Sequence, residues 1–261
     1  MNLSRNSLHL ITMAKIWSII VLSVATFTAG VSAAATTVFP AAAGSTTISS
    51  PIVVSGTYDG GMKRFNRNNG CNAGEGGDAD AVFHIQSGGT LQNVIIGSAQ
   101  TEGVHCLGPC TIRNVWWEDV CEDALTIKQT SGTSYIIGGG ARNAADKVIQ
   151  HNGGGTVSVT DFFVSNFGKL YRSCGNCSTQ YKRTFVATGV VAESGSSLAG
   201  INTNYGDKAT IKNTCTAGVT DICQRYTGNN SGDEPTKTGS GNDGTYCVYD
   251  STVTRRSTCL G

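Results

Sequence analysis

Short runs of β-branched and aliphatic residues recur through the middle of the chain, and no long segment combines a helical period with capping residues at both ends. The runs begin roughly every 20 to 28 residues, a spacing typical of solenoid coils. Glycine- and asparagine-rich stretches between them favour bends, because these residues accept left-handed backbone angles. The runs are 91–96, 111–116, 134–137, 156–160, 184–191 and 209–213.

This pattern predicts an all-β protein built as a single-stranded parallel β-helix, in which each coil buries its inward aliphatic side chains against the next. A β-sandwich is the main alternative. The two ends differ from the middle. Residues 34–56 are expected to form the first coil or a cap, and the polar segment 221–261 is expected to be a tail tied down by disulfides, not a second domain.

The first 33 residues have the pattern of a secretory signal peptide, since Arg5 and Lys15 precede the apolar run 16–29 and small residues follow. Cleavage is expected after Ala33. The mature chain, 34–261, then has about 228 residues, which suits one domain with a sizeable core. The protein is therefore expected to be secreted and extracellular.

All ten cysteines lie in the predicted mature chain. An even count in a secreted protein favours disulfides over zinc. The pairs Cys106/Cys110 and Cys174/Cys177 have spacings that a zinc or redox site can use, but no second CxxC or histidine pair accompanies them. The sequence predicts structural disulfides without determining how they pair.

The formal net charge of +1 gives no general attraction to nucleic acid or to membranes, so neither is an expected partner and any electrostatic function must be local. Sequons at Asn176 and Asn229 predict glycosylation.

One stretch, 101–129, is unusually rich in carboxylates for a region of short β-branched runs. Such density indicates a solvated face or a bound hard cation, and Ca²⁺ prefers oxygen ligands of this type. The adjacent pair Glu122 and Asp123 would point to opposite faces of a regular strand, so they can share a metal only where the chain bends. The five carboxylates are Glu102, Glu118, Asp119, Glu122 and Asp123.

Four ordered blocks carry a resemblance to a known family: GVHCLGPCTIRNVWWEDVCEDALTIK, ADKVIQHN, NFGKLYR and GINTNYGDKATI. Together they resemble the pectate lyases of polysaccharide lyase family 3, and the resemblance covers the chain from Val53 to Thr214. It implies a compact right-handed parallel β-helix, an extracellular location, Ca²⁺ dependence and β-elimination of polygalacturonate.

The resemblance also implies roles for individual residues. Some relatives carry aspartate where this chain has Glu102, which offers the same ligating group on a longer arm, so calcium affinity is expected to change while the chemistry survives. Glu75 falls in a block where the family often has an acidic residue near the substrate groove. The implied calcium ligands are Glu102, Glu122 and Asp123, and the implied catalytic residues are Lys147, Lys169 and Arg172.

The implied chemistry suits these residue types. Galacturonate has a weakly acidic proton on C5, and its removal creates negative charge beside the C6 carboxylate that a bound metal ion can stabilise. A free lysine titrates at about 10.4, but a nearby metal ion and a second cation disfavour its charged form. Lys147 or Lys169 is therefore the expected base, and Arg172 is expected to hold a substrate carboxylate bidentately.

Several neighbouring residues have structural interpretations beside the functional one. Lys128 either projects into the same groove and binds substrate or pairs with Glu118 or Asp119. His105 is expected to be a buried, hydrogen-bonded histidine. Trp116 and Trp117 should point to opposite faces of a regular strand, which leaves one of them free to form an outer platform for sugar stacking. Three further residues, Asn202, Asn204 and Asp207, are expected to cap backbone groups at a bend.

The sequence thus predicts a secreted, monomeric, calcium-dependent lyase that cleaves de-esterified α-1,4-polygalacturonate and leaves 4,5-unsaturated products. One alternative is a hydrolase on the same fold, which would need paired carboxylates flanking the bond with room for water. The other is a non-catalytic pectin-binding or host-interaction protein that has kept the fold.

Overall fold

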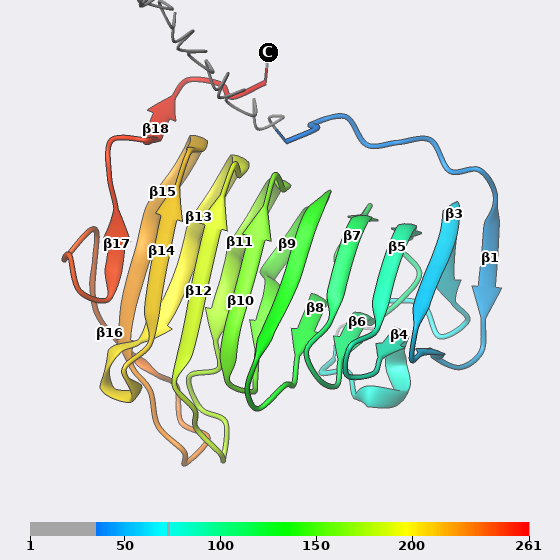
Figure 1. Ribbon diagram of the computed structural model, residues 1–261, viewed down its shortest axis with the longest axis horizontal. Helices are drawn as coiled ribbons and strands as arrows, with labels where there is room; N and C mark the ends of the chain where they lie inside the picture. Colours follow the sequence, from blue (N-terminus) through cyan, green and yellow to red (C-terminus); the bar gives the residue numbers. More distant parts are fainter. Residues whose placement is uncertain (1–34, 72–73, 261) are drawn as a thin grey trace, which may run out of the picture. The chain divides into compact units, whose positions relative to one another are not determined.

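The chain forms a parallel β-solenoid, which confirms the predicted fold and excludes the β-sandwich (Figure 1). The computed structural model describes residues 35–71 and 74–260, so the predicted signal peptide lies outside the described residues. Within them, no helix is long and apolar enough to cross a membrane. Apart from short 3₁₀ turns at Asp78–Asp80 and Thr203–Tyr205, the regular structure is all strand.

The strands follow one another along the solenoid in chain order, and some of the longer ones run through a bend from one face to the next. They are β1 (Ser45–Ile48), β2 (Ile52–Val54), β3 (Thr57–Arg67), β4 (Ala81–Ile85), β5 (Thr90–Ile96), β6 (Glu102–Cys106), β7 (Thr111–Trp117), β8 (Asp123–Ile127), β9 (Thr133–His151), β10 (Gly155–Thr160), β11 (Phe163–Ser173), β12 (Arg183–Thr188), β13 (Val191–Asn202), β14 (Lys208–Lys212), β15 (Thr214–Thr227), β16 (Thr236–Ser240), β17 (Cys247–Tyr249) and β18 (Val253–Arg256).

The ladder that matters for function runs through β2, β4, β6, β8 and then the C-terminal parts of β9, β11, β13 and β15. Equivalent inward side chains stack on one another along it, which is how a chain of short apolar runs builds a continuous core. One such stack, buried throughout, is Phe83, Val104, Leu125, Ile149, Tyr171, Ala199 and Cys223.

Asparagines turn the chain at several bends, as the sequence pattern indicates. Asn93 and Asn114 have φ of 53° and 50°, and the side-chain amide of Asn114 donates to Oδ1 of Asn93 at 2.8 Å. Asn143 and Asn166 repeat the arrangement, with φ of 60° and 52°, and the side-chain amide of Asn166 donates a hydrogen bond to Oδ1 of Asn143 at 3.0 Å. Their side chains bond along the stack where the backbone leaves regular strand geometry.

The two tryptophans do point to opposite faces, but neither forms an outer platform. Trp117 belongs to the main core, whereas Trp116 lies in a separate buried cluster with Ile95 and Phe163. The N-terminal segment covers this cluster, because the ring of Phe39 packs edge-on against Trp116 with centroids 4.9 Å apart. Trp116 is only 2% exposed, so the prediction that one tryptophan is free to stack on a sugar is wrong.

Five disulfides account for all ten cysteines, which confirms the preference for disulfides over zinc. Two of them tie down the C-terminal segment, as expected. In that segment β16 pairs antiparallel with β15, whereas β17 and β18 pair parallel with β14 and β15 and so continue two faces of the solenoid. The pairs are Cys71–Cys121, Cys106–Cys110, Cys174–Cys177, Cys215–Cys259 and Cys223–Cys247.

Candidate active site

Two rows of positions run along the face that contains β4, β6 and β8. On each strand the two positions stand three residues apart, with two inward residues between them; in β8, Ala124 and Leu125 are buried between Asp123 and Thr126. Parallel pairing stacks equivalent positions at about 4.8 Å per strand. The first row is Ala81, Glu102, Asp123, Lys147, Lys169, Ser197 and Asp221, and the second is His84, His105, Thr126, Gln150, Arg172, Gly200 and Gln224.

A groove of about 570 Å³ lies over the middle of these rows. Its lining includes every residue that the sequence proposed for the site, although they are spread over almost 100 positions of the chain. These residues are Glu75, Glu102, Glu122, Asp123, Lys128, Lys147, Lys169 and Arg172.

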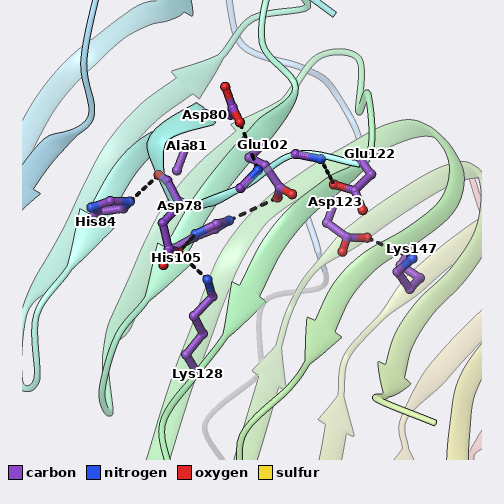
Figure 2. Close-up of polar contacts among 12 residues, drawn as sticks. Asp78, Asp80, Ala81, His84, Glu102, His105, Glu122, Asp123, Lys128 and Lys147 are labelled. Atoms are coloured by element: carbon purple, nitrogen blue, oxygen red, sulfur yellow. Dashed lines mark hydrogen bonds and ion pairs between the residues drawn. The ribbon is translucent and has the colours of Figure 1, made fainter. Parts of the chain in front are cut away.

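The acidic end of the groove is built on β6 and β8. Glu102 and Asp123 are paired in register at the starts of these strands, and Glu122 lies in the bend immediately before β8. That bend lets Glu122 and Asp123 face the same groove, as a shared metal site requires (Figure 2). The backbone N–H of Gly76 donates to Oε2 of Glu122 at 3.3 Å, so the segment before the first 3₁₀ turn closes over this end.

These carboxylates are crowded and poorly solvated. Burial raises the pKa of Asp123 to about 8; the charge of Lys147 opposes this shift, and the charges of Glu122 and Glu102 add to it. Burial and a hydrogen bond with Glu102 raise the pKa of Glu122 to about 7. The pKa of Glu75 is also raised, first by a hydrogen bond with Glu122. In the absence of a cation, the cluster therefore holds protons at pH values where exposed carboxylates do not.

The donor set fits a hard cation. Asp123 is 4% exposed, and its Oδ1 accepts no hydrogen bond from the described residues, since its ion-pair partner, Nζ of Lys147, lies 3.6 Å away. A buried carboxylate oxygen without a partner is costly unless a cation or proton satisfies it. With Glu102 and Glu122 alongside, the group offers several oxygen ligands and no nitrogen or sulfur, which is the ligand set that Ca²⁺ takes.

The basic end begins on the next coil. Nζ of Lys147 lies 3.6 Å from Oδ1 of Asp123 and 2.6 Å from Oδ2 of Asp146, and Nζ of Lys169 lies 3.2 Å from Oδ1 of Asp146. Burial lowers the pKa of Lys147, but Asp123 and Asp146 outweigh it and the net shift is upward. The second cation that the sequence reasoning relied on is present as Lys169, but carboxylates dominate around Lys147.

Arg172 lies beyond the lysines, towards the C-terminal coils. It is 7% exposed, and its guanidinium stacks on the ring of Tyr226 at 3.8 Å from the centroid. Its Nη1 donates to Oδ1 of Asn202 at 3.4 Å. Tyr226, Glu234 and other residues of the C-terminal segment line the groove beside it, so this segment forms part of the site.

This geometry can be compared with that of known proteins. A family model described as pectate lyase matches residues 36–233. The chain belongs to the pectate lyase family. It is 61% identical over 205 residues to "Probable pectate lyase E" of Neosartorya fischeri, covering 77% of this chain and 80% of the relative. It is 59% identical over 213 residues to "Pectate lyase E" of Emericella nidulans, covering 80% and 83%.

Solved structures of the family share the fold. The catalytic domain of pectate lyase PelI from Erwinia chrysanthemi superposes with a TM-score of 0.69 at 32% identity, covering 82% of this chain and 98% of that one. PelI in complex with tetragalacturonic acid gives a TM-score of 0.68 at 32% identity, covering 82% and 71%.

In this member of the pectate lyase family, the structure distinguishes the functional from the structural interpretation of Lys128. Lys128 lines the groove and forms its ion pair with Asp78, so pairing with Glu118 or Asp119 is wrong. Glu118 instead forms an ion pair with Arg64, with its Oε2 2.6 Å from Nε.

The histidine and bend predictions are also confirmed. His105 is buried, and its two ring nitrogens contact the carboxylates of Asp78 and Glu102. Asp207 accepts hydrogen bonds from the backbone N–H groups of Arg183 and Asn202, at 2.8 and 3.0 Å, and so caps the bend as expected.

Sequence reasoning about the pectate lyase motifs missed four residues of this region. Asp146 precedes Lys147 inside a matched block, so its position beside a lysine predicted to be catalytic was an available signal. Nothing in the sequence indicated that Tyr226 packs under Arg172 or that Asp78 and His84 lie beside His105, because these contacts join segments that only the coiling brings together.

Proposed function

We propose that the protein is a secreted, calcium-dependent pectate lyase that cleaves de-esterified α-1,4-polygalacturonate by β-elimination and leaves a 4,5-unsaturated sugar on the new non-reducing end. The observation that carries the proposal is the division of one groove into a carboxylate cluster, in which a buried oxygen of Asp123 accepts no hydrogen bond from the described residues, and an adjoining row of cationic side chains. Its substrate class agrees with the tetragalacturonic acid bound to the related PelI.

Glu102, Glu122 and Asp123 would hold Ca²⁺. When bound, this ion supplies Lewis-acid stabilisation of the charge that develops beside the substrate's C6 carboxylate. A methyl ester lacks the negative charge of the free C6 carboxylate, so an ion held by this cluster would bind a methyl-esterified sugar less well. Rates on highly esterified pectin are therefore expected to be lower than on free polygalacturonate.

Lys147 or Lys169 accepts the C5 proton at Nζ, the C4–C5 double bond forms as the C4–O bond breaks, and the leaving oxygen takes a proton from water. The charges of Asp123 and Asp146 raise the pKa of Lys147, so neutralising Asp123 leaves more of this lysine as the neutral amine that can accept a proton. Arg172 holds a substrate carboxylate through its planar fork of N–H groups, in the orientation set by the ring of Tyr226.

A hydrolase is disfavoured by the same geometry. Glycoside hydrolysis needs two carboxyl groups on either side of the scissile bond. Here four of the groove's carboxylates, those of Glu75, Glu102, Glu122 and Asp123, gather at one end. Towards the other end, Asp146 is ion-paired with Lys147 and Lys169, and Glu234 lies beside Arg172.

The experiment is ultraviolet absorbance after mixing mature protein with polygalacturonate at alkaline pH, first with calcium and then with excess chelator. A rise in absorbance that chelator abolishes and calcium restores is expected. New reducing ends without absorbance would establish the hydrolase, and binding without turnover at any calcium level would establish the binding protein.

Secretion and processing belong to the same proposal. The predicted signal peptide, 1–33, and five disulfides support an oxidising extracellular compartment. N-terminal sequencing of the protein from culture medium should begin at Ala34. Light scattering of the same material should give the mass of a monomer.

A further inference from the structure

Beyond Glu102, at the N-terminal end of the groove, lie two histidines and an aspartate to which the proposed reaction gives no role. His84 on β4 and His105 on β6 are paired in register, and their rings stack with centroids 5.8 Å apart and 18° between planes. Asp78 lies beside them in the 3₁₀ turn (Figure 2). One ligand atom from each of the three lies within 4.8 Å of the other two.

The hydrogen bonds of His105 indicate which ring nitrogen is available. Nε2 lies 3.0 Å from Oε2 of Glu102, and Nδ1 lies 2.8 Å from Oδ1 of Asp78. A neutral imidazole has one proton for these two carboxylates. When Nε2 donates to Glu102, Nδ1 presents its lone pair towards Asp78, and a cation between them satisfies both atoms. An imidazole that donates to a carboxylate from its far nitrogen is the usual arrangement of a metal-bound histidine.

We propose that Asp78, His84 and His105 form a second cation site that takes a transition metal such as Zn²⁺ and is distinct from the carboxylate cluster. Two imidazole nitrogens and one carboxylate oxygen suit Zn²⁺, whereas Ca²⁺ takes oxygen ligands. Asp78 is exposed and His84 is half-buried, so an ion can enter from solvent and keep water as a fourth ligand. The site does not depend on the proposed lyase activity.

Two contacts link the site to its surroundings. Nζ of Lys128 forms an ion pair with Oδ1 of Asp78, so a bound metal must displace this ammonium. His84 Nε2 lies 2.7 Å from the backbone oxygen of Asp78 and must turn from it if that nitrogen binds the metal. Both requirements reduce the affinity. Removing the Lys128 ammonium should therefore tighten binding.

The test is isothermal titration of ZnCl₂ into the mature protein after chelator treatment and dialysis, at neutral pH. Wild type is expected to bind one Zn²⁺ at this site, His84→Gln to weaken that affinity about tenfold or more, and Lys128→Met to strengthen it. A Ca²⁺ titration of His84→Gln, expected to match wild type, shows that the variant is folded.

The matched control is Glu122→Gln, which alters the carboxylate cluster but touches none of the three proposed ligands. It should bind Zn²⁺ as wild type does. The proposal is overturned if wild type binds no Zn²⁺, if His84→Gln binds it as tightly as wild type, or if Glu122→Gln abolishes binding, since the ion would then occupy the carboxylate cluster.

Discussion

The two ends of the groove use the same positions of the same coiled ladder but carry opposite charge. Glu102 and Asp123 occupy the first row on β6 and β8, and Lys147 and Lys169 occupy it on β9 and β11. The sign of the charge changes within one strand spacing, about 4.8 Å. In a parallel β-helix, one outward residue per coil thus determines the charge at each point along the groove, while the neighbouring inward residues maintain the hydrophobic core.

The ends also differ in how their charges are satisfied. At the basic end, Asp146 bonds both lysines and Tyr226 supports Arg172. At the acidic end, burial raises the pKa values of Glu122 and Asp123, and an oxygen of Asp123 has no hydrogen-bond partner among the described residues. The cationic side chains of the basic end have protein partners without a ligand, whereas the crowded carboxylates of the acidic end need a proton or a cation.

The largest expected effect separates the two lysines. Lys147→Gln and Lys169→Gln should be compared at saturating calcium, by initial rates of unsaturated product. Loss of the general base is expected to lower kcat by about 10² to 10⁴, whereas loss of the other lysine acts through positioning and lowers it less. Equal, small losses in both variants would show that neither lysine is the base.

The charge difference predicts how the stability of calcium-free protein depends on pH. The folded-state pKa values of Asp123 and Glu122, about 8 and 7, lie above the unfolded values, so the folded state binds more protons. Their contribution to stability is full below about pH 4 and is lost as pH rises towards 8, by an amount on the order of a few kcal/mol.

The melting temperature of calcium-free protein should therefore fall between pH 5 and pH 8, and calcium should restore it at pH 8. A melting temperature that stays constant over this range without calcium would contradict the assignment of buried, proton-holding carboxylates.

Substitutions on either side of the charge boundary should shift stability in opposite directions. At pH 8 without calcium, Asp123→Asn removes a buried charge and should raise the free energy of unfolding by about 1 kcal/mol or more. Lys147→Met leaves Asp123 and Asp146 without a shared partner and should lower it by a similar amount. Urea unfolding measures both, and shifts of the same sign would refute the comparison.

The smallest expected effect concerns the support of Arg172. Tyr226→Leu removes the ring beneath the guanidinium and should raise KM for polygalacturonate several-fold, in line with a cation–π contact of about 1 kcal/mol. Tyr226→Phe keeps the ring and should stay near wild type. In an Arg172→Lys background the effect of Tyr226→Leu should largely disappear, and additive effects would show that Tyr226 acts by another route.

The sequence predicted the fold well because a solenoid's core is made of local repeats. Runs such as 111–116 and 156–160 became strands at the expected period, and the bend at Glu122 that a shared metal site requires is present. The site residues come from motifs resembling those of the family, so their gathering into one groove followed once the coils were in register.

What the sequence could not supply are contacts between segments that no local pattern relates. Trp116 is buried because an N-terminal segment places Phe39 on it, and Tyr226 reaches Arg172 across two further coils. Lys128 pairs with Asp78, fifty positions earlier, although Glu118 and Asp119 are nearer in sequence. Each contact depends on how distant segments lie once the chain is coiled, which composition and spacing do not encode.

The most direct test of the divided groove is calcium affinity, measured by isothermal titration for wild type, Asp123→Asn and Lys169→Gln. Asp123→Asn is expected to bind Ca²⁺ at least tenfold more weakly, while Lys169→Gln keeps wild-type affinity and has a lower turnover. Wild-type calcium affinity in Asp123→Asn, or an equal loss in both variants, would contradict the assignment of calcium to the acidic end.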